Sequence, residues 1–475
     1  MCLTAPGRRK ENRRSKEPFQ SRRLIWRLVQ SIIGTTDWPL GEKREISHLQ
    51  NEPRPTSWLS GPLILAIGLT FWPLIAATAI LASESFASLP EYFVHRGIGH
   101  LVLVIALIIS LLASLRIRPQ IKPKLSATQG LLIALVAVSI IYSTAYAQPD
   151  LRLLIPFSIY LFLDIMAVLC CVALFSKWPR ETLRWVWNAM FLSMIVYLPA
   201  FAFIILSNPG EQAFGWNGSW FPVQNVRWFA ALVVIAIAAG TAGPWRGEAA
   251  SKPFDALRPF LLFILWTILF WTGSRAQVLG ILGALTMLAV VGGQRGRRIA
   301  IRAMKIAAPS LLVSVTLPVP NGSYGFLHRF LWKMVNEETM NALSSRRTEM
   351  WAASFQKIME KPLFGHGIGQ FRSTTDYRFN AYHSHSFPIE ALLNLGLIGG
   401  GALIALVIGR YWGLTRNAMS IGLPRDAMPP FLVMTTILLM SLISGGVLLI
   451  TISVYFILSA AGLWAVTKQH TNPVP

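Results

Sequence analysis

The sequence has few charged residues and almost no cysteine. Asp, Glu, Lys and Arg make up 13% of its 475 residues, compared with about 25% in typical soluble domains. Hydrophobic residues make up 53% and recur in runs of membrane-spanning length, which excludes a single soluble globule. The cysteines are Cys2, Cys170 and Cys171. The last two are neighbours inside an apolar run, so no disulfide framework is expected.

Acidic side chains are scarcer than basic ones, with 21 Asp and Glu against 43 Lys and Arg, and the net charge is +22. Such a charge often indicates nucleic-acid binding. Here the basic residues lie in the gaps between apolar runs instead of forming one folded polar domain. We therefore expect membrane lipids, and no nucleic acid, to be the partners of this positive charge.

Twelve apolar runs predict an all-α, polytopic membrane protein with about 12 transmembrane helices. They lie at roughly 62–81, 98–115, 127–146, 153–175, 185–206, 228–243, 257–272, 275–292, 303–317, 387–409, 429–443 and 447–465. We expect transmembrane helices 1–9 in residues 58–317, a large loop at 318–386, and helices 10–12 with a short tail in 387–475.

The first 57 residues are polar and basic, and we expect no cleavable signal peptide among them. We expect residues 1–57 to form a basic cytoplasmic tail. Within it, residues 24–33 form either a short helix on the inner leaflet or part of a solvated segment.

Positive charge predicts the orientation of the spans. The tail, the gaps on its side of the membrane and Lys468 hold 31 of the 43 Lys and Arg. This excess places both termini in the cytoplasm by the positive-inside rule. Loop 318–386 holds eight more, but its 69 residues exceed the length of about 60 residues up to which charge controls orientation. The loop is thus predicted to lie outside the cytoplasm.

Three polar side chains stand out on the outer side: Arg227 before the sixth run, Arg275 between the seventh and eighth, and His385 before the tenth. Arginine binds phosphate oxygens bidentately, and a neutral histidine, with an unperturbed pKa of about 6.5, can accept a proton. A lipid-phosphate substrate and a hydroxyl acceptor suit this set. Alternatively, the arginines only extend to the lipid headgroups.

Other residues allow different interpretations. His366, His383, His385 and Asp376 could together bind a metal, but His-x-His without a closely spaced carboxylate is a weak metal motif. We predict no metal and no cofactor. Asp164 is an acid within the fourth run, where it is either functional or paired with a neighbouring helix. Composition and spacing alone leave both a transporter and a lipid-linked transferase open.

Four segments resemble those of the O-antigen ligase and polymerase family. HSFPIEALLNLGLIGG is similar to the family signature of His, then Asn, Ser or Gln, nine residues and Gly, with His385 and Gly396 at its ends. SSRRTEMWAASFQKIMEKPLFGHGIGQF is similar to the head of the family's large periplasmic loop, with Arg347 at its arginine. TGSRAQVLGIL and NVRWFAAL are similar to motifs around two further arginines, here Arg275 and Arg227.

The resemblance extends over about residues 180–410, with two departures from the family pattern. Asn394 stands two residues before the motif glycine, where many members carry an acidic residue. His383 doubles the motif histidine, so it could share the role of His385.

The resemblance implies a GT-C-like membrane glycosyltransferase of a bacterial inner membrane, with many helices, a large periplasmic helical loop and a periplasmic active site. It implies transfer of a glycan from an undecaprenyl-diphosphate carrier to a hydroxyl acceptor, without a nucleotide sugar or a required metal. The acceptor is lipid A core in a ligase, or a growing O-antigen or exopolysaccharide in a polymerase. A polysaccharide transporter or flippase is a further alternative.

Each candidate residue then has an expected role. We assign Arg227 and Arg275 to the diphosphate, because fixed guanidinium groups neutralise the charge that grows on it without reorganisation. We assign His385 to the acceptor hydroxyl, as the base that removes its proton. His383, Arg347 and Asp164 are secondary candidates.

Overall fold

The computed structural model describes residues 61–83, 91–115, 125–146, 149–178, 180–207, 226–243, 252–319, 324–329, 331, 346–375, 381, 383–444 and 450–471. All of them belong to one compact unit of the chain, Ser57–Pro475. These residues form helices joined by turns, with no strand among them, and the all-α prediction is confirmed. The predicted tail at 1–57 and the candidate Asp376 lie outside the described residues.

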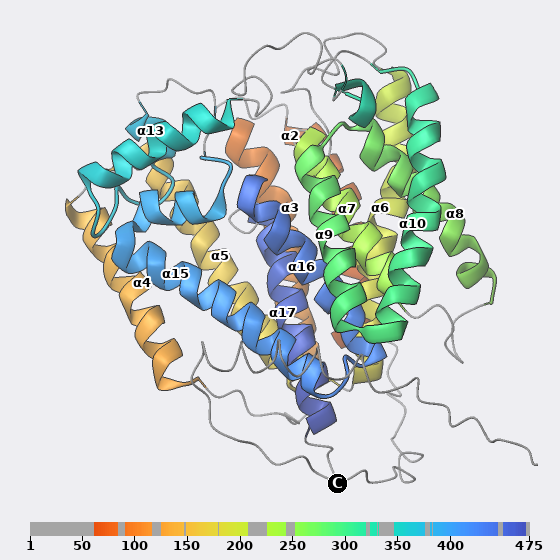
Figure 1. Cartoon of the computed structure of the whole chain (residues 1–475). Helices are drawn as coiled ribbons and strands as arrows, with labels where there is room; N and C mark the ends of the chain where they lie inside the picture. Colours follow the sequence, from red (N-terminus) through yellow and green to blue (C-terminus); the bar gives the residue numbers. More distant parts are fainter. Residues whose placement is uncertain are drawn as a thin grey trace, which may run out of the picture. The chain divides into compact units, whose positions relative to one another are not determined.

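Each of the twelve predicted apolar runs coincides with a helix (Figure 1). These helices are α2 (Gly61–Ser83), α3 (Glu91–Ala113), α4 (Ala127–Tyr146), α5 (Leu151–Phe175), α6 (Arg180–Ser207), α7 (Val226–Ala242), α8 (Lys252–Trp271), α9 (Arg275–Val291), α10 (Gly293–Thr316), α15 (Phe387–Ser420), α16 (Met428–Ser444) and α17 (Ile450–Thr471). Within the described ranges, seven helices are long and apolar enough to cross a membrane, and four shorter ones are also apolar. The chain is a multi-pass membrane protein, while the count of twelve spans stays a prediction.

The predicted large loop lies between α10 and α15. Its described part contains α13 (Arg347–Glu360) and the short α14 (Phe371–Thr374). A 3-10 turn, η2 (Arg425–Ala427), leads into α16. The loop is therefore helical in part, as the family resemblance implies, and its predicted boundaries at 318 and 386 stay a prediction.

Two helices, α10 and α15, extend furthest beyond the apolar runs that predict them. The run at 303–317 lies within α10, which begins at Gly293, and the run at 387–409 lies within α15, which ends at Ser420. Arginine and lysine favour helices, so a helix can continue after its sequence becomes basic. Hydropathy marks the part of a helix that suits lipid, and it does not mark where the helix ends.

Helix α7 is buried on all sides, between α6, α8, α9 and α16. Its sequence is apolar all round and rich in alanine, which is typical of a helix inside a bundle. Gly240 allows α6 to pack closely against α7, since a Cβ added there would lie 2.4 Å from the ring of Phe191. This central helix begins at Val226, so its first turn carries Arg227.

Helix α15 is broken at the motif glycine. Gly396 has φ 67° and ψ −171°, a conformation that is essentially restricted to glycine. A Cβ added to Gly396 would lie 2.3 Å from the carbonyl group of Leu363, and one added to Gly365 would lie 2.5 Å from that of Asn394. Both glycines therefore allow the backbones of α15 and the loop to touch.

The loop segment 362–367 docks into this break. An unbroken helix would bond each N–H to the carbonyl four residues before it. At the break two of these bonds are missing, so two N–H donors and two carbonyl acceptors of α15 have no partner within the helix. The loop supplies a partner for each of the four. The four bonds are Leu397 N to Pro362 O (2.7 Å), Ile398 N to Leu363 O (3.1 Å), His366 N to Leu393 O (2.9 Å) and Gly367 N to Asn394 O (2.9 Å).

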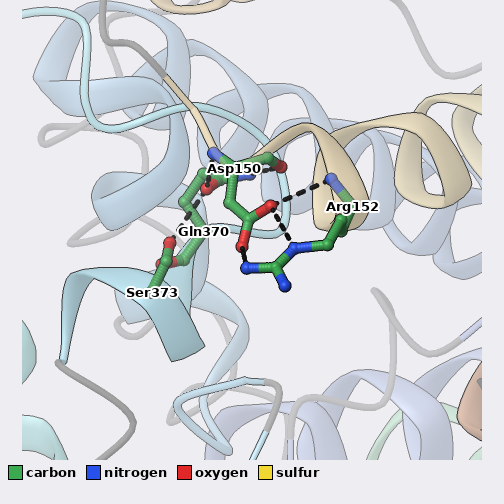
Figure 2. Close-up of polar contacts among 4 residues, drawn as sticks. All are labelled: Asp150, Arg152, Gln370 and Ser373. Atoms are coloured by element: carbon green, nitrogen blue, oxygen red, sulfur yellow. Dashed lines mark hydrogen bonds and ion pairs between the residues drawn. The ribbon is translucent and has the colours of Figure 1, made fainter.

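Beyond the break, Gln370 joins the loop to the start of α5 (Figure 2). Its Oε1 accepts from Asp150 N at 2.9 Å and from Ser373 Oγ at 2.9 Å, and its Nε2 donates to Asp150 O at 3.3 Å. Asp150 in turn caps α5 by accepting from Arg152 N at 3.0 Å. The loop after α13 is thus held to both α15 and α5. Helix α13 itself packs on α15 (Figure 1).

Candidate active site

Four arginines from four different segments come together in an arginine cluster. Arg227 lies on the first turn of α7, Arg275 begins α9, Arg347 begins α13, and Arg329 lies in the segment 324–329. The charges of Arg347, Arg329 and Arg275 all act on Arg227, and the charge of Arg275 acts on Arg347. The structure thus unites the predicted Arg227, Arg275 and Arg347 and adds Arg329 to them.

Hydrogen bonds to the backbone hold the segments of this cluster. Gln277 on α9 donates from Nε2 to the carbonyl of Arg227 at 3.0 Å, which ties the first turns of α7 and α9. Arg329 is 4% exposed and donates from Nη1 to the carbonyl of Gly273 at 3.3 Å. Gly325 N donates to Trp271 O at 2.7 Å, so the segment carrying Arg329 is fixed on the turn between α8 and α9.

Burial and like charge make this cluster receptive to an anion. Burial, and then the charge of Arg275, lower the pKa of Arg347 to about 10, so it stays protonated at neutral pH. Its Nε has no hydrogen-bond partner among the described residues. An anion bound here would relieve repulsion between fixed positive charges.

The start of α9 adds a second feature that favours anions. Ser274 occupies the N-cap position, but its side chain makes no capping bond. The hydroxyl is buried and has no hydrogen-bond partner in the described part of the chain. Helix N-termini carry partial positive charge and free N–H groups, so they bind phosphate readily. Ser274 and Arg275 therefore present a hydroxyl and a guanidinium at one such terminus.

His383, Ser384 and His385 form a tight histidine turn before α15. His385 has φ 59°, in the left-handed region that non-glycine residues rarely adopt. Its backbone N–H donates to Nδ1 of His383 at 3.2 Å, and the two rings lie 4.3 Å apart between centroids, at 75° to each other. Since His383 accepts at Nδ1, its neutral ring carries its proton on Nε2 and offers an N–H donor there.

The backbone of Ser384 is held through both its N–H and its carbonyl. Its N–H donates to Glu390 Oε2 at 2.7 Å, and its carbonyl accepts from Trp351 Nε1 at 2.9 Å. Ser384 is 0% exposed, so these bonds are sheltered from water. Trp351 lies one helical turn after Arg347 on α13. One helix thus supplies an arginine to the cluster and a hydrogen bond to the histidine turn.

A ring contact links the histidine turn to α7. The rings of His383 and Trp228 lie 6.4 Å apart between centroids, and Trp228 directly follows Arg227. The predicted histidines therefore lie near the start of the same helix that carries the first predicted arginine. The candidate site comprises this turn and the arginine cluster.

Sequence reasoning missed Arg329 and Glu390. Arg329 is one of eight basic residues in the large loop, and no motif marks it. Glu390 had a usable signal, because an acid inside an apolar span suggests function. Its Oε1 accepts from Asn394 Nδ2 at 3.2 Å. The chain thus has a buried acid one helical turn before Asn394, the position where many family members carry theirs.

Asp164 has a different set of partners. Its Oδ1 accepts from Ser453 Oγ at 2.6 Å and lies 3.6 Å from Nε2 of His100. These residues come from α5, α17 and α3, and we call them the Asp164 group. The interpretation of Asp164 as a paired residue between helices is the one that these contacts favour.

The metal interpretation finds no support in the described residues. No group of three or more His, Cys, Asp or Glu side chains is placed there to hold an ion. His366 bonds through Nε2 to the carbonyl of Lys357 at 2.8 Å, within the docked loop. Asp376 lies outside the described residues.

Comparison with known families gives one match. Residues 260–404 match the family profile of O-antigen ligases, and the resemblance inferred from the motifs is confirmed. The match contains Arg275, Arg329, Arg347 and the histidine turn, while Arg227 lies before it. A search of curated proteins finds no match. Residues 260–404 are thus similar to a family of glycosyltransferase-like membrane enzymes that process lipid-linked glycans.

Proposed function

We propose that this multi-pass membrane protein with an O-antigen ligase domain transfers a glycan from an undecaprenyl-diphosphate carrier to a hydroxyl acceptor. The transfer takes place at the periplasmic face of a bacterial inner membrane. The observation that carries the proposal is the convergence of the arginine cluster and the histidine turn, through α7 and α13. A leaving group that gains negative charge and a hydroxyl that loses a proton need these two kinds of side chain side by side.

The arginine cluster binds the diphosphate of the carrier. Arg227 and Arg275 grip its oxygens, and Arg347 and Arg329 add charge from the loop side. When the bond between the anomeric carbon and the diphosphate oxygen breaks, its electron pair leaves with the diphosphate. Guanidinium groups that are already in place stabilise this charge without moving.

The histidine turn serves the acceptor. The acceptor oxygen forms a bond to the anomeric carbon, and its proton passes to His385. His383 acts differently, since its Nδ1 already accepts the backbone N–H of His385. Its Nε2–H donates to a sugar or phosphate oxygen and orients the substrate. No nucleotide sugar and no metal is needed for this chemistry.

The preferred acceptor is lipid A core, which makes the enzyme an O-antigen ligase, the activity after which the matching family is described. Repeat-unit polymerisation uses the same chemistry on a growing glycan and is the alternative. A deletion strain separates them by its surface glycans. Long carrier-linked polymer that is absent from lipid A core supports the ligase, and accumulation of single repeat units supports the polymerase.

The experiment that tests the mechanism is transfer in vitro from purified carrier-linked donor, with donor binding measured separately. We expect His385→Ala to abolish transfer while donor binding changes by less than about threefold, because the arginines hold the diphosphate. His383→Ala should retain part of the activity. An active His385→Ala enzyme beside an inactive His383→Ala enzyme would reverse the two roles. Full activity in both would leave no base in the mechanism.

The periplasmic placement has its own test. A single cysteine at Thr374, in the large loop, should react with an impermeant thiol reagent in whole cells. A cysteine at Ser420, at the other end of α15, should not react. The reverse pattern would put the candidate site in the cytoplasm.

A further inference from the structure

The histidine turn is hydrogen-bonded to a buried acid on α15. Glu390 is 5% exposed, and its Oε2 accepts the backbone N–H of Ser384 at 2.7 Å. Ser384 is the residue between the two histidines, so this bond holds the backbone that joins them. We propose that Glu390 is a positioning residue, which holds His383 and His385 in register with the arginine cluster; this inference rests on the proposed transfer function.

The geometry explains why this turn needs such a residue. His385 has the left-handed φ of 59°, which is unfavourable for a side chain with a Cβ. The turn keeps that conformation only if its surroundings hold it. Trp351 holds the Ser384 carbonyl from α13, and Glu390 holds the Ser384 N–H from α15. Removing Glu390 would release one end and let the imidazoles turn away.

The Glu390 side chain uses both of its oxygens as hydrogen-bond acceptors. Oε1, the oxygen that does not bond Ser384, accepts from Asn394 Nδ2 at 3.2 Å, so the carboxyl group is itself fixed. Asn394 Oδ1 has no hydrogen-bond partner among the described residues. A glutamine at 390 could therefore keep the bond to Ser384 while Asn394 rotates its amide to accept the new N–H.

This possibility gives a rescue test that separates position from charge. Glu390→Leu removes the acceptor and Glu390→Gln keeps it. We expect Glu390→Leu to lower kcat for transfer by about tenfold or more, with donor binding within about threefold of the wild type. Glu390→Gln should restore most of the kcat. Glu360→Gln, at the end of α13 and paired with Lys357, is the matched control and should be unchanged.

The outcomes decide the inference separately from the proposed function. A wild-type kcat in Glu390→Leu, with His385→Ala inactive, would overturn the positioning role and leave the function intact. An inactive Glu390→Gln enzyme with normal donor binding would also overturn it, because the charge itself would then be needed. No transfer by the wild type would instead contradict the proposed function.

A second variant covers the case in which Glu390→Leu does not accumulate. Trp351→Phe keeps an aromatic ring on α13 but removes the hydrogen bond to the other end of the Ser384 peptide. We expect its kcat to fall by about fivefold with donor binding unchanged, since a lost neutral hydrogen bond has a smaller effect. A wild-type kcat in Trp351→Phe would show that holding this peptide does not matter for transfer.

Discussion

The candidate site and the Asp164 group both gather polar side chains from distant helices, but they do so with opposite electrostatics. In the candidate site, four positive charges act on one another, and His385 has a left-handed backbone. In the Asp164 group, a carboxylate faces an imidazole at 3.6 Å and a hydroxyl at 2.6 Å. The first arrangement gathers like charges, whereas the second places a carboxyl group beside hydrogen-bonding partners.

The arrangement of charges distinguishes a binding site from a contact that joins helices better than the presence of polar residues alone. An acid within an apolar helix is a functional candidate by default. Asp164 instead joins α5 to α3 and α17 with complementary partners, and its side chain is 28% exposed. In the arginine cluster like charges act on one another instead, and a bound anion would relieve that repulsion. A group whose charges repel one another in the free protein is the better indicator of a binding site.

The largest effect should come from the arginine cluster. Arg275→Lys keeps the charge but loses the bidentate fork. We expect transfer to fall by about 10²–10³-fold, equivalent to about 2.7–4 kcal/mol by analogy with the loss of an oxyanion donor. Arg302→Lys, on the basic start of α10, is the control and should be neutral. Measured transfer at wild-type rates in Arg275→Lys would reduce Arg275 to a headgroup anchor and remove the contrast with Asp164.

The next effect concerns the break in α15. Gly396→Ala would place a Cβ 2.3 Å from the Leu363 carbonyl, so the loop must move away. A displacement of about 1 Å can lower a rate by about 100-fold, and we expect a loss of that order in transfer. Gly401→Ala, on the same helix with nothing within 4 Å of the added Cβ, should keep full activity. Similar losses in both variants would show that α15 tolerates no substitution and that the break has no special role.

A much smaller effect is expected at the Asp164 group. Asp164→Asn keeps an oxygen for the Ser453 hydroxyl and loses only the charge that faces His100. Transfer should stay within about threefold of the wild type, with stability in detergent lower by about 0.5–1.5 kcal/mol. Loss of transfer as severe as in Arg275→Lys would make Asp164 part of the mechanism. Loss of glycan export with transfer intact would favour a transporter.

The smallest effect should be a pH dependence of the docked loop. Burial lowers the pKa of His366 below its ordinary value of about 6.5. Below pH about 6.5 the undocked loop binds a proton more readily than the docked loop does. Docking is therefore fully favoured above pH about 6.5 and weakens as the pH falls. The protection of the His366 and Gly367 amides from hydrogen exchange, corrected for the intrinsic pH dependence of exchange, should therefore fall on acidification. His366→Gln should remove this dependence, and an unchanged dependence would assign it to another group.

Much of the fold follows from the sequence because lipid imposes a simple rule. Backbone groups in a membrane must bond within their own helix, so each apolar run predicts a helix. All twelve runs coincide with helices, including the short run at 303–317. The boundaries of α10 and α15 were harder to predict, because each helix extends into basic sequence beyond its apolar run.

The sequence by itself determined that this is an all-α, multi-pass membrane protein with a segment similar to O-antigen ligases, because apolar runs and motif residues are local features. It also predicted that Arg227, Arg275 and His385 lie on one face. Only the tertiary structure showed that Arg329 joins them, that Glu390 accepts a hydrogen bond from the histidine turn, and that Asp164 accepts one from Ser453. Each of these contacts depends on how separate segments pack, and neither the period nor the charge of a single segment contains that information.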